Sequence, residues 1–215
     1  MNNDYGEYWE KCWNEENSEE LFNYLDGYFE MKSPEIDIFK ENNIKNICDA
    51  ASGFGAYSLA LASNGFNVHS FDISETAVKM TINALKKYGM DAEKVMTASI
   101  LDTGYEDESF DGVVAHAVLD HLTVSDSKKA LIELFRITRK NGLIWISFDM
   151  VEEDDLKEPH VLLKDGTMKY TCGSRAGLLY HPYDWAGINT LLKDYRIVYK
   201  ADKGERERSV ILRKE

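Results

Sequence analysis

Residues 47–74, with the sequence ICDAASGFGAYSLALASNGFNVHSFDIS, decide how this chain folds. The segment opens with an apolar stretch, predicted as a strand, that ends at Asp49. It then turns through Gly53 and Gly55 into a helix, and a second predicted strand leads to Asp72. A strand, a glycine loop, a helix and a strand begin a doubly wound α/β sheet, in which ligands bind at the carboxyl ends of the strands.

The glycine loop and the second acid together predict a site for a ligand that contains a nucleoside. Glycine lets the backbone approach a ligand closely, and the free N–H groups at the start of a helix point into the crevice. A carboxylate at the place of Asp72 can accept hydrogen bonds from both hydroxyls of a ribose. A glycine pair alone would indicate only a tight turn, so the coincidence of loop, helix and acids carries the prediction.

Strands and helices alternate through the first 150 residues. Ser33 and Pro34 are typical of a helix start, and Asn141-Gly142 is typical of a helix end. Continuously apolar strands between helices imply a parallel sheet that is covered on both faces. The predicted strands are 44–50, 66–71, 94–98, 110–115 and 143–148, and the predicted helices are 5–13, 18–30, 34–42, 56–63, 75–88 and 127–140.

The pattern changes after Asp149. Two short strands, 161–164 and 167–171, flank Asp165-Gly166, which is a strong hairpin signal. A loop rich in Gly and Tyr, a helix over 184–193 and two terminal strands that must be antiparallel to each other follow. We expect one domain with a seven-stranded, mostly parallel sheet and an antiparallel C-terminal strand. Its predicted parts are a helical lid (1–42), a ligand-binding core with the glycine loop (43–150), an inserted hairpin and loop (151–183) and a last helix with terminal strands (184–215).

Composition narrows the partners of the protein. The 215 residues carry a formal net charge of −13, which repels nucleic acid backbones and anionic membranes. The three cysteines are far apart in the chain, so neither a disulfide framework nor a zinc site is expected. No apolar run is long enough to span a bilayer, and the N-terminal residues lack the pattern of a signal peptide. We therefore expect a cytoplasmic monomer or homodimer.

Two further segments indicate which protein family the chain resembles. They are EDESFDGVVAHAVLDHL at 106–122, an acid-rich approach to a strand and a following turn, and KNGLIWIS at 140–147, a helix end and a strand. With the loop at 47–74, they make the chain resemble the class I S-adenosylmethionine-dependent methyltransferases of the small-molecule type. The resemblance implies S-adenosylmethionine as cofactor and transfer of its methyl group to a small-molecule acceptor.

The resemblance also implies roles for individual residues of the cofactor site. Two positions depart from the family pattern: Ala51 replaces the usual first glycine, and Ser99 stands where many members have an aspartate that contacts adenine. In a shifted register, Asp102 would take the role of Ser99. The implied cofactor-binding residues are Asp49, Ala51, Ser52, Gly53, Gly55, Asp72, Ile73, Ser99, Ile100, Ala115 and His116.

The acceptor site is less clearly marked. His116, His121 and His181 are candidates for a catalytic base, which a hydroxyl acceptor would need and a thiol would not. Aromatic rings of the predicted lid and of the insertion suit a cover over a cationic cofactor, although each ring could instead pack the lid onto the core. No ligand set has a metal-binding spacing, even beside the pair Asp120-His121, so no metal is expected. The expected substrate-binding residues are Tyr8, Trp9, Arg175, Tyr180 and Tyr183.

Two other functions remain open at this stage. An oxidoreductase of the NAD type would share the glycine loop, but its fingerprint requires a third small residue for helix packing, and Ser58 is an imperfect match. A non-catalytic S-adenosylmethionine-binding module would need no acceptor pocket.

Overall fold

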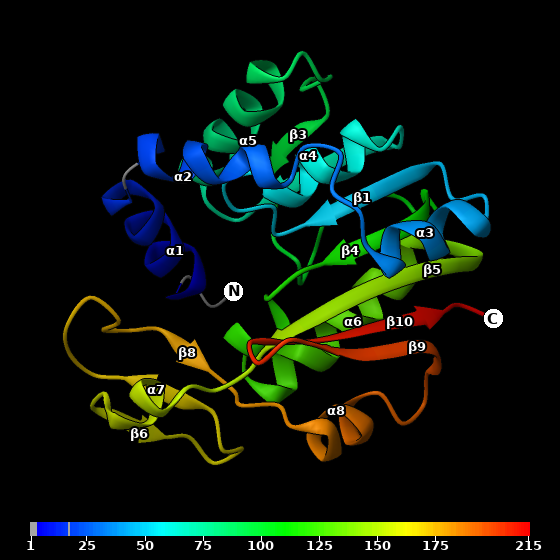
Figure 1. Ribbon diagram of the computed structural model, residues 1–215. Helices are drawn as coiled ribbons and strands as arrows, with labels where there is room; N and C mark the ends of the chain where they lie inside the picture. The colour runs from blue at the N-terminus through cyan, green and yellow to red at the C-terminus, as the bar shows by residue number, and fades with distance from the viewer. Residues whose placement is uncertain (1–3, 17) are drawn as a thin grey trace.

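A seven-stranded sheet forms the centre of the protein, which a computed structural model describes over residues 4–16 and 18–215 (Figure 1). The strand order is β3-β2-β1-β4-β5-β10-β9. The first five strands of this order are parallel, and β10 is antiparallel to both β5 and β9, as predicted. The strands are β1 (Asn46–Ala50), β2 (Asn67–Asp72), β3 (Val95–Thr97), β4 (Phe110–Ala115), β5 (Thr138–Asp149), β9 (Arg196–Lys203) and β10 (Glu207–Arg213).

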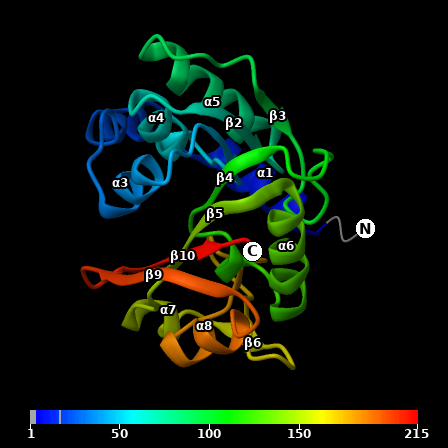
Figure 2. The same ribbon diagram turned by 90° about the vertical axis from the view of Figure 1, so that its right-hand side faces the viewer.

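Helices cover both faces of this sheet, as Figure 2 shows from the side. On one face α3 and α4 pack against the strands, and on the other α6 and α8 do so. The helices are α1 (Asp4–Glu15), α2 (Ser18–Tyr24), α3 (Pro34–Glu41), α4 (Ala56–Ser63), α5 (Glu75–Lys87), α6 (Val124–Ile137), α7 (Glu153–Lys157) and α8 (Trp185–Leu191), with short 3-10 helices at Leu25–Gly27 and Leu119–His121.

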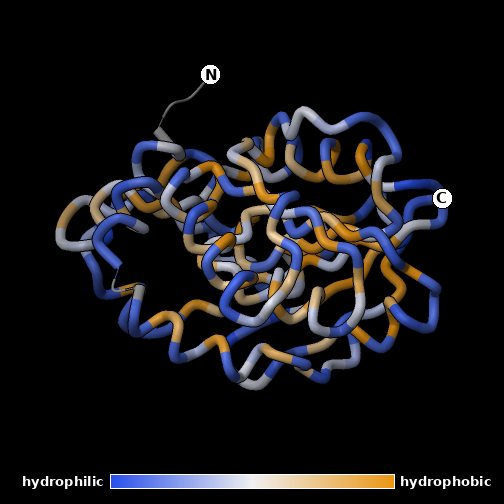
Figure 3. Tube along the Cα trace, turned by 90° about the horizontal axis from the view of Figure 1, so that it is seen from above, coloured by the Kyte–Doolittle hydropathy of each residue, from blue (hydrophilic) through white to orange (hydrophobic). Residues whose placement is uncertain are grey.

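The two cores follow from the alternation of side chains along each strand. In β4, Val113 packs into the core beneath α6, and the next residue, Val114, packs into the core beneath α3. In β5, Ile144 packs into the core beneath α6, and Trp145 packs into the core beneath α3. Hydrophobic residues accordingly gather along the central strands in Figure 3. Among the described residues, no helix combines the length and the apolar character needed to cross a bilayer.

The predicted helix at 127–140 is placed three residues too late. The helix α6 starts after Thr123, whose side chain accepts a hydrogen bond from the Asp126 N–H, and it ends at Ile137. Residues 138–142 belong instead to β5, which pairs with β4 on both sides of an irregularity between Phe110 and Gly112. The Asn141-Gly142 pair therefore makes a bend within β5 and does not close the helix.

The helix α1 and the insertion (residues 151–183) lie near the carboxyl ends of the parallel strands (Figure 1). The predicted hairpin around Asp165-Gly166 is present as β6 (His160–Leu162) and β7 (Met168–Tyr170), and β8 (Leu179–Tyr180) adds a third, unpredicted strand. Opposite this small sheet lies α1, at the ends toward which β1 and β4 point. Residues 1–3 and 17 of the predicted lid lie outside the described residues.

Candidate active site

The loop between β1 and α4 is held in shape by its own backbone. The Ser52 N–H donates to the Phe71 carbonyl, and the Gly55 N–H donates to the Ser52 carbonyl, both at 2.9 Å. Ala51, Gly53 and Gly55 have φ angles of 63°, 54° and 90°, in the left-handed region that favours glycine. Ala51 thus keeps the glycine-like conformation although it carries a methyl group.

The two glycines of this loop have different tasks. A Cβ atom at Gly55 would lie 2.8 Å from the Thr81 Cα, so the absence of a side chain lets α4 pack on α5. A Cβ atom at Gly53 would lie 3.0 Å from the Trp13 ring, so α1 can rest on the loop there. Gly55 is buried behind the loop, and its predicted contact with a cofactor is replaced by a packing role.

Asp72 closes β2 and anchors the turn into α5. Its two carboxylate oxygens accept hydrogen bonds from the Gly53 and Ser74 N–H groups, each at 2.9 Å. The side chain is 4% exposed, and this burial raises the pKa of Asp72, although the two N–H groups oppose the shift. Each oxygen keeps a second lone pair, so the carboxylate can still accept hydrogen bonds from a ligand.

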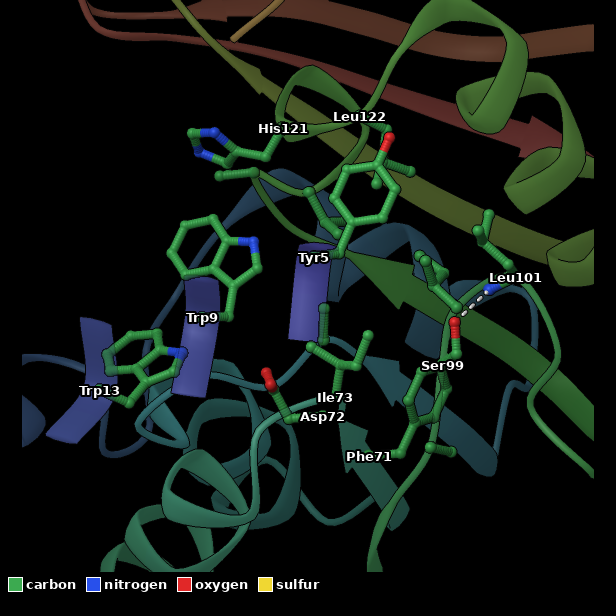
Figure 4. A pocket seen from close by; sticks show the side chains of 15 residues that line it. Tyr5, Trp9, Trp13, Phe71, Asp72, Ile73, Ser99, Leu101, His121 and Leu122 are labelled. Carbon is green, nitrogen blue, oxygen red and sulfur yellow. Dashed lines mark hydrogen bonds between the residues drawn. The ribbon is translucent and has the colours of Figure 1, made fainter. Parts of the chain in front are cut away.

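A cavity with an empty volume of about 620 Å³ opens in front of Asp72 (Figure 4). Its wall is mostly apolar, and it receives side chains from α1 and from the segments that follow β1, β2, β3 and β4. A polar anchor in an apolar, concave site is typical of ligand binding. The lining residues are Tyr5, Trp9, Trp13, Ala51, Phe71, Asp72, Ile73, Ala98, Ser99, Ile100, Leu101, Ala117, Val118, His121 and Leu122. We call this space the donor cavity.

A smaller cavity continues from the donor cavity at Ala51, which lines both. Asp49 and His116 also line it. Asp49 accepts a hydrogen bond from the Ser58 hydroxyl at 2.5 Å. Burial raises the pKa of Asp49 to about 6, against the opposing effects of Ser58 and of nearby His116.

His116 is engaged away from the centre of the site. Its Nε2 lies 2.9 Å from a carboxylate oxygen of Glu207 on β10, and its ring stacks on Tyr57 with 3.9 Å between the centroids. These contacts fix the imidazole beside Asp49. The predicted place of His116 near the cofactor pocket therefore agrees with the geometry, and the Glu207 contact leaves Nδ1 as the nitrogen that could act as a base.

Three cavities share His121 as a lining residue. It lines the donor cavity and two further cavities that lie toward the small sheet. Its Nδ1 donates to the Leu179 carbonyl at 3.1 Å, and its ring meets Trp9 edge to face, with 5.2 Å between the centroids. Figure 4 shows the His121 ring above Trp9.

One of these further cavities, which we call the acceptor cavity, lies beneath the insertion. Arg175 and Tyr180 line it together with His121 and Asp149. Arg175 is paired with Asp155, and the Tyr180 hydroxyl donates to the Asp149 carbonyl at 3.0 Å. The other cavity is lined by Tyr8 and Trp9 of α1 and by residues of the small sheet. Four of the predicted substrate-binding residues thus line two cavities that share His121, with Arg175 and Tyr180 in one and Tyr8 and Trp9 in the other.

Three predicted site residues lie elsewhere. Ala115 is fully buried in the core beneath α6, and Ala117 and Val118 line the donor cavity in its place. Tyr183 is 3% exposed and packs on Phe148, so the core holds it away from a substrate. His181 lines none of the four cavities described; its Nδ1 meets the Thr167 hydroxyl at 3.2 Å, which ties it to the small sheet.

Sequence reasoning also missed residues on the cavity walls. Leu101 and Val118 lie on loops after strands, where apolar residues give no distinctive signal. Asp149 was missed although it ends β5, and the rule that ligands bind at the carboxyl ends of parallel strands could have found it. Tyr5 and Trp13 of α1 also line the donor cavity, and Tyr5 lines the cavity beside the small sheet as well.

Comparison with known proteins bears directly on this arrangement. Residues 48–146, from β1 to β5, match the family model described as a methyltransferase domain. Over these residues the chain contains a methyltransferase domain. The match includes the glycine loop, Asp72 and His121, and so confirms the family resemblance read from the sequence.

Relatives of the methyltransferase domain agree with this assignment. The glycine/sarcosine N-methyltransferase of Aphanothece halophytica is 27% identical over 148 residues, which are 64% of this chain and 51% of that protein. The chain spans about half or less of the length of the curated relatives it matches.

Two crystal structures share the fold of the methyltransferase domain. A protein from Pyrococcus horikoshii OT3 has a TM-score of 0.70 and 18% identity, with 91% of this chain and 99% of that chain covered. A SAM-dependent methyltransferase from Methanosarcina mazei has a TM-score of 0.69 and 19% identity, with 85% of this chain and 98% of that chain covered.

Proposed function

We propose that this protein transfers the methyl group of S-adenosylmethionine to a small-molecule acceptor. The observation that carries the proposal is the junction at His121, where the donor cavity anchored by Asp72 meets the acceptor cavity beneath the insertion. A cofactor and an acceptor held in these two cavities would have their reacting groups side by side, and such positioning alone contributes on the order of 7–11 kcal/mol.

The donor cavity fits an adenosyl group in its chemistry. Asp72 would accept hydrogen bonds from the ribose hydroxyls, and Ile73 and Ile100 would pack on adenine, with Ser99 at its edge. The smaller cavity at Asp49 fits the methionyl amine, because a buried carboxylate attracts a cation. When bound, S-adenosylmethionine supplies a methyl group activated by a cationic sulfur.

The acceptor would bind between α1 and the insertion. Tyr8 and Trp9 approach from α1, and Arg175 and Tyr180 approach from the insertion. Of the predicted lid (1–42), we assign α1 the role of a cover that excludes water from the reaction, whereas α3 packs into the core. His121 is the best-placed catalytic base, since it lines both the donor and the acceptor cavity. The similarity to a methyltransferase that acts on glycine and sarcosine supports a small acceptor.

Charge and cysteine chemistry support the expected setting of the protein. The net charge of −13 argues against a nucleic acid substrate. The three cysteines are free, as is usual in the reducing cytoplasm. We therefore propose a cytoplasmic enzyme, a monomer or a homodimer, that takes its substrates from solution.

A thermal-shift comparison of ligands tests the proposed cofactor. S-adenosylhomocysteine should raise the melting temperature and NAD should not, because only the ligand that binds the folded state stabilises it. Stabilisation by NAD alone would favour the oxidoreductase. Incubation with methyl-labelled S-adenosylmethionine and a panel of thiols, amines, phenols and metalloid anions then tests turnover. Binding without transfer to any acceptor would point to a non-catalytic module.

A further inference from the structure

Three side chains with metal-binding chemistry meet where β4 and β5 end. Asp120 and His121 lie on the 3-10 helix after β4, and Asp149 is the last residue of β5. One ligand atom from each of the three lies within 4.8 Å of the others. The sheet brings together residues that are 28 or more positions apart in the sequence, so the spacing along the chain gave no sign of the set.

Asp120 carries an unsatisfied oxygen into this cluster. Its side chain is fully buried, at 0% exposure. One carboxylate oxygen, Oδ2, accepts a hydrogen bond from the Asp149 N–H at 2.9 Å, whereas Oδ1 has no hydrogen-bond partner among the described residues. A buried carboxylate oxygen without a partner is costly and rare in native structures. A cation bound beside it would remove that cost.

His121 is oriented as a metal ligand would be. Its Nδ1–H donates to the Leu179 carbonyl at 3.1 Å, which leaves the lone pair of a neutral imidazole on Nε2. Histidines that bind metals commonly fix their second nitrogen in this way, through a backbone carbonyl or a carboxylate.

The cluster also lacks a protein cation that would balance its charge. Within the described part of the chain, no ion pair joins Asp120 or Asp149 to a lysine or an arginine. The two arginines that line the same cavity are paired elsewhere, Arg175 with Asp155 and Arg206 with Glu152. Two carboxylates held this close repel each other unless a proton or a cation lies between them.

We propose that Asp120, His121 and Asp149 bind one divalent cation of the kind that takes mixed nitrogen and oxygen ligands, such as Mn²⁺ or Zn²⁺. A cation held at about 2.1 Å from each atom keeps neighbouring ligands roughly 3–4 Å apart, so the three ligand atoms, which lie within 4.8 Å of one another, would draw closer together on binding. Both residues line the acceptor cavity, so the remaining coordination positions face it. A bound cation would occupy the Nε2 lone pair of His121, so the cation would take over from the imidazole in activating an acceptor oxygen, a role that rests on the proposed function.

Metal titration of the chelator-treated protein tests the site without any enzymatic assay. Loss of the free Mn²⁺ signal in electron paramagnetic resonance, and the heat of Zn²⁺ binding, should each show one saturable site per chain. Asp149→Asn and His121→Gln should each weaken binding by at least about tenfold. Asp154→Asn should leave it unchanged, because Asp154 is an exposed carboxylate of α7 that bonds only Lys157 among the described residues.

Stabilisation by S-adenosylhomocysteine, measured on every variant, separates a lost ligand from a lost fold. The proposal fails if the wild type shows no saturable binding of either ion up to roughly 1 mM, which corresponds to about −4 kcal/mol. It also fails if a variant that still responds to S-adenosylhomocysteine binds metal as tightly as the wild type. Because the titration contains no cofactor, a failure to bind metal would not count against the proposed methyl transfer. A failure to transfer a methyl group would likewise not count against the metal site.

Discussion

Ala51 explains how the chain departs from its family at a single position. The usual glycine is absent, yet the backbone keeps the glycine-like φ of 63°. Hydrogen bonds from the N–H groups of Ser52 and Gly55, which follow it in the chain, hold the turn in this conformation. A side chain in the left-handed region costs about 1–2 kcal/mol, which the surrounding loop has to offset.

Asp72→Asn tests the proposed ribose contact. The amide keeps one oxygen acceptor but loses the charge and the second acceptor. We expect S-adenosylhomocysteine to bind more than about tenfold more weakly, which corresponds to about 1.4 kcal/mol, as measured by calorimetry. Asp91→Asn, which changes an exposed acid outside the donor cavity, is the control. Unchanged affinity in Asp72→Asn would remove Asp72 from the ribose.

Ser99→Ala and Asp102→Asn decide which residue contacts adenine. Ser99 lines the donor cavity, whereas Asp102 is exposed and does not. Loss of one hydrogen bond, worth about 1 kcal/mol, should weaken S-adenosylhomocysteine binding roughly fivefold in Ser99→Ala. The affinity of Asp102→Asn should stay within about twofold of the wild type. The opposite ranking would assign the adenine contact to Asp102.

Elements are joined across the site by α1. At one end of α1, the Tyr5 hydroxyl donates to the Asp126 carboxylate at 2.9 Å, beside the start of α6. Five residues later, Glu10 accepts hydrogen bonds from the Ser74 and Thr76 hydroxyls, at 2.6 and 2.7 Å, at the start of α5. These hydrogen bonds lower the pKa of Glu10 to about 2, Ser74 having the largest effect.

Glu10→Gln tests whether this contact holds the proposed lid closed. The amide loses the charge-assisted hydrogen bonds to α5, so α1 should detach more readily. We expect S-adenosylhomocysteine to dissociate about three- to tenfold faster, which tryptophan fluorescence in a stopped-flow instrument can follow. Glu15→Gln, on the same helix, changes a residue that pairs with Lys11 at 3.8 Å, and this variant should release S-adenosylhomocysteine at the wild-type rate. Equal dissociation rates for the wild type and both variants would show that Glu10 does not hold α1 closed over the site.

A second contact between elements fixes the loop that follows β3. Glu133 of α6 accepts hydrogen bonds from the Thr103 N–H and hydroxyl, at 2.9 and 2.6 Å, and pairs with Arg136. Arg136 first, and then Thr103, lower the pKa of Glu133 from 4.5 to about 2. A depressed pKa means that the carboxylate stabilises the fold above pH 4.5, and that this contribution disappears as the pH falls toward 2.

Glu133→Gln should therefore lower the free energy of unfolding at pH 7 by roughly 1–2 kcal/mol. It should also reduce the loss of stability between pH 4.5 and 2. Urea unfolding at several pH values measures both effects. Asp107→Asn changes the other acidic partner of Arg136. Because the Asp107 side chain is 78% exposed, this variant should lose less than about 0.5 kcal/mol of unfolding free energy. A variant as acid-sensitive as the wild type would show that Glu133 is not the group responsible.

Sequence patterns predicted most elements, and the exceptions have physical reasons. The helix α6 was displaced because both Thr123 and Ser127 are suitable N-cap residues, and only the tertiary structure selects Thr123. The strand β8 has two residues and exists only through its pairing with β7. A strand so short has no periodicity to detect.

At the scale of the whole molecule, alternation of strands and helices was enough to predict a parallel sheet and a ligand at its carboxyl edge. The alternation could not predict the strand order, because long-range packing determines which strands become neighbours. That order sets β4 and β5 side by side and so joins Asp120 and His121 to Asp149. The residues after each strand that form cavity walls, such as Ala117, likewise become visible only in three dimensions.

The position of α1 has a consequence for the catalytic cycle. Tyr5 and Trp9 of this one helix form walls of both the donor cavity and the cavity beside the small sheet. If the proposed donor and acceptor both bind beneath this helix, we expect a compulsory order in which the methyl donor enters first and the spent donor leaves last. Product inhibition should show S-adenosylhomocysteine competing with S-adenosylmethionine alone, and a pattern typical of random entry would mean that the two ligands exchange past α1 independently.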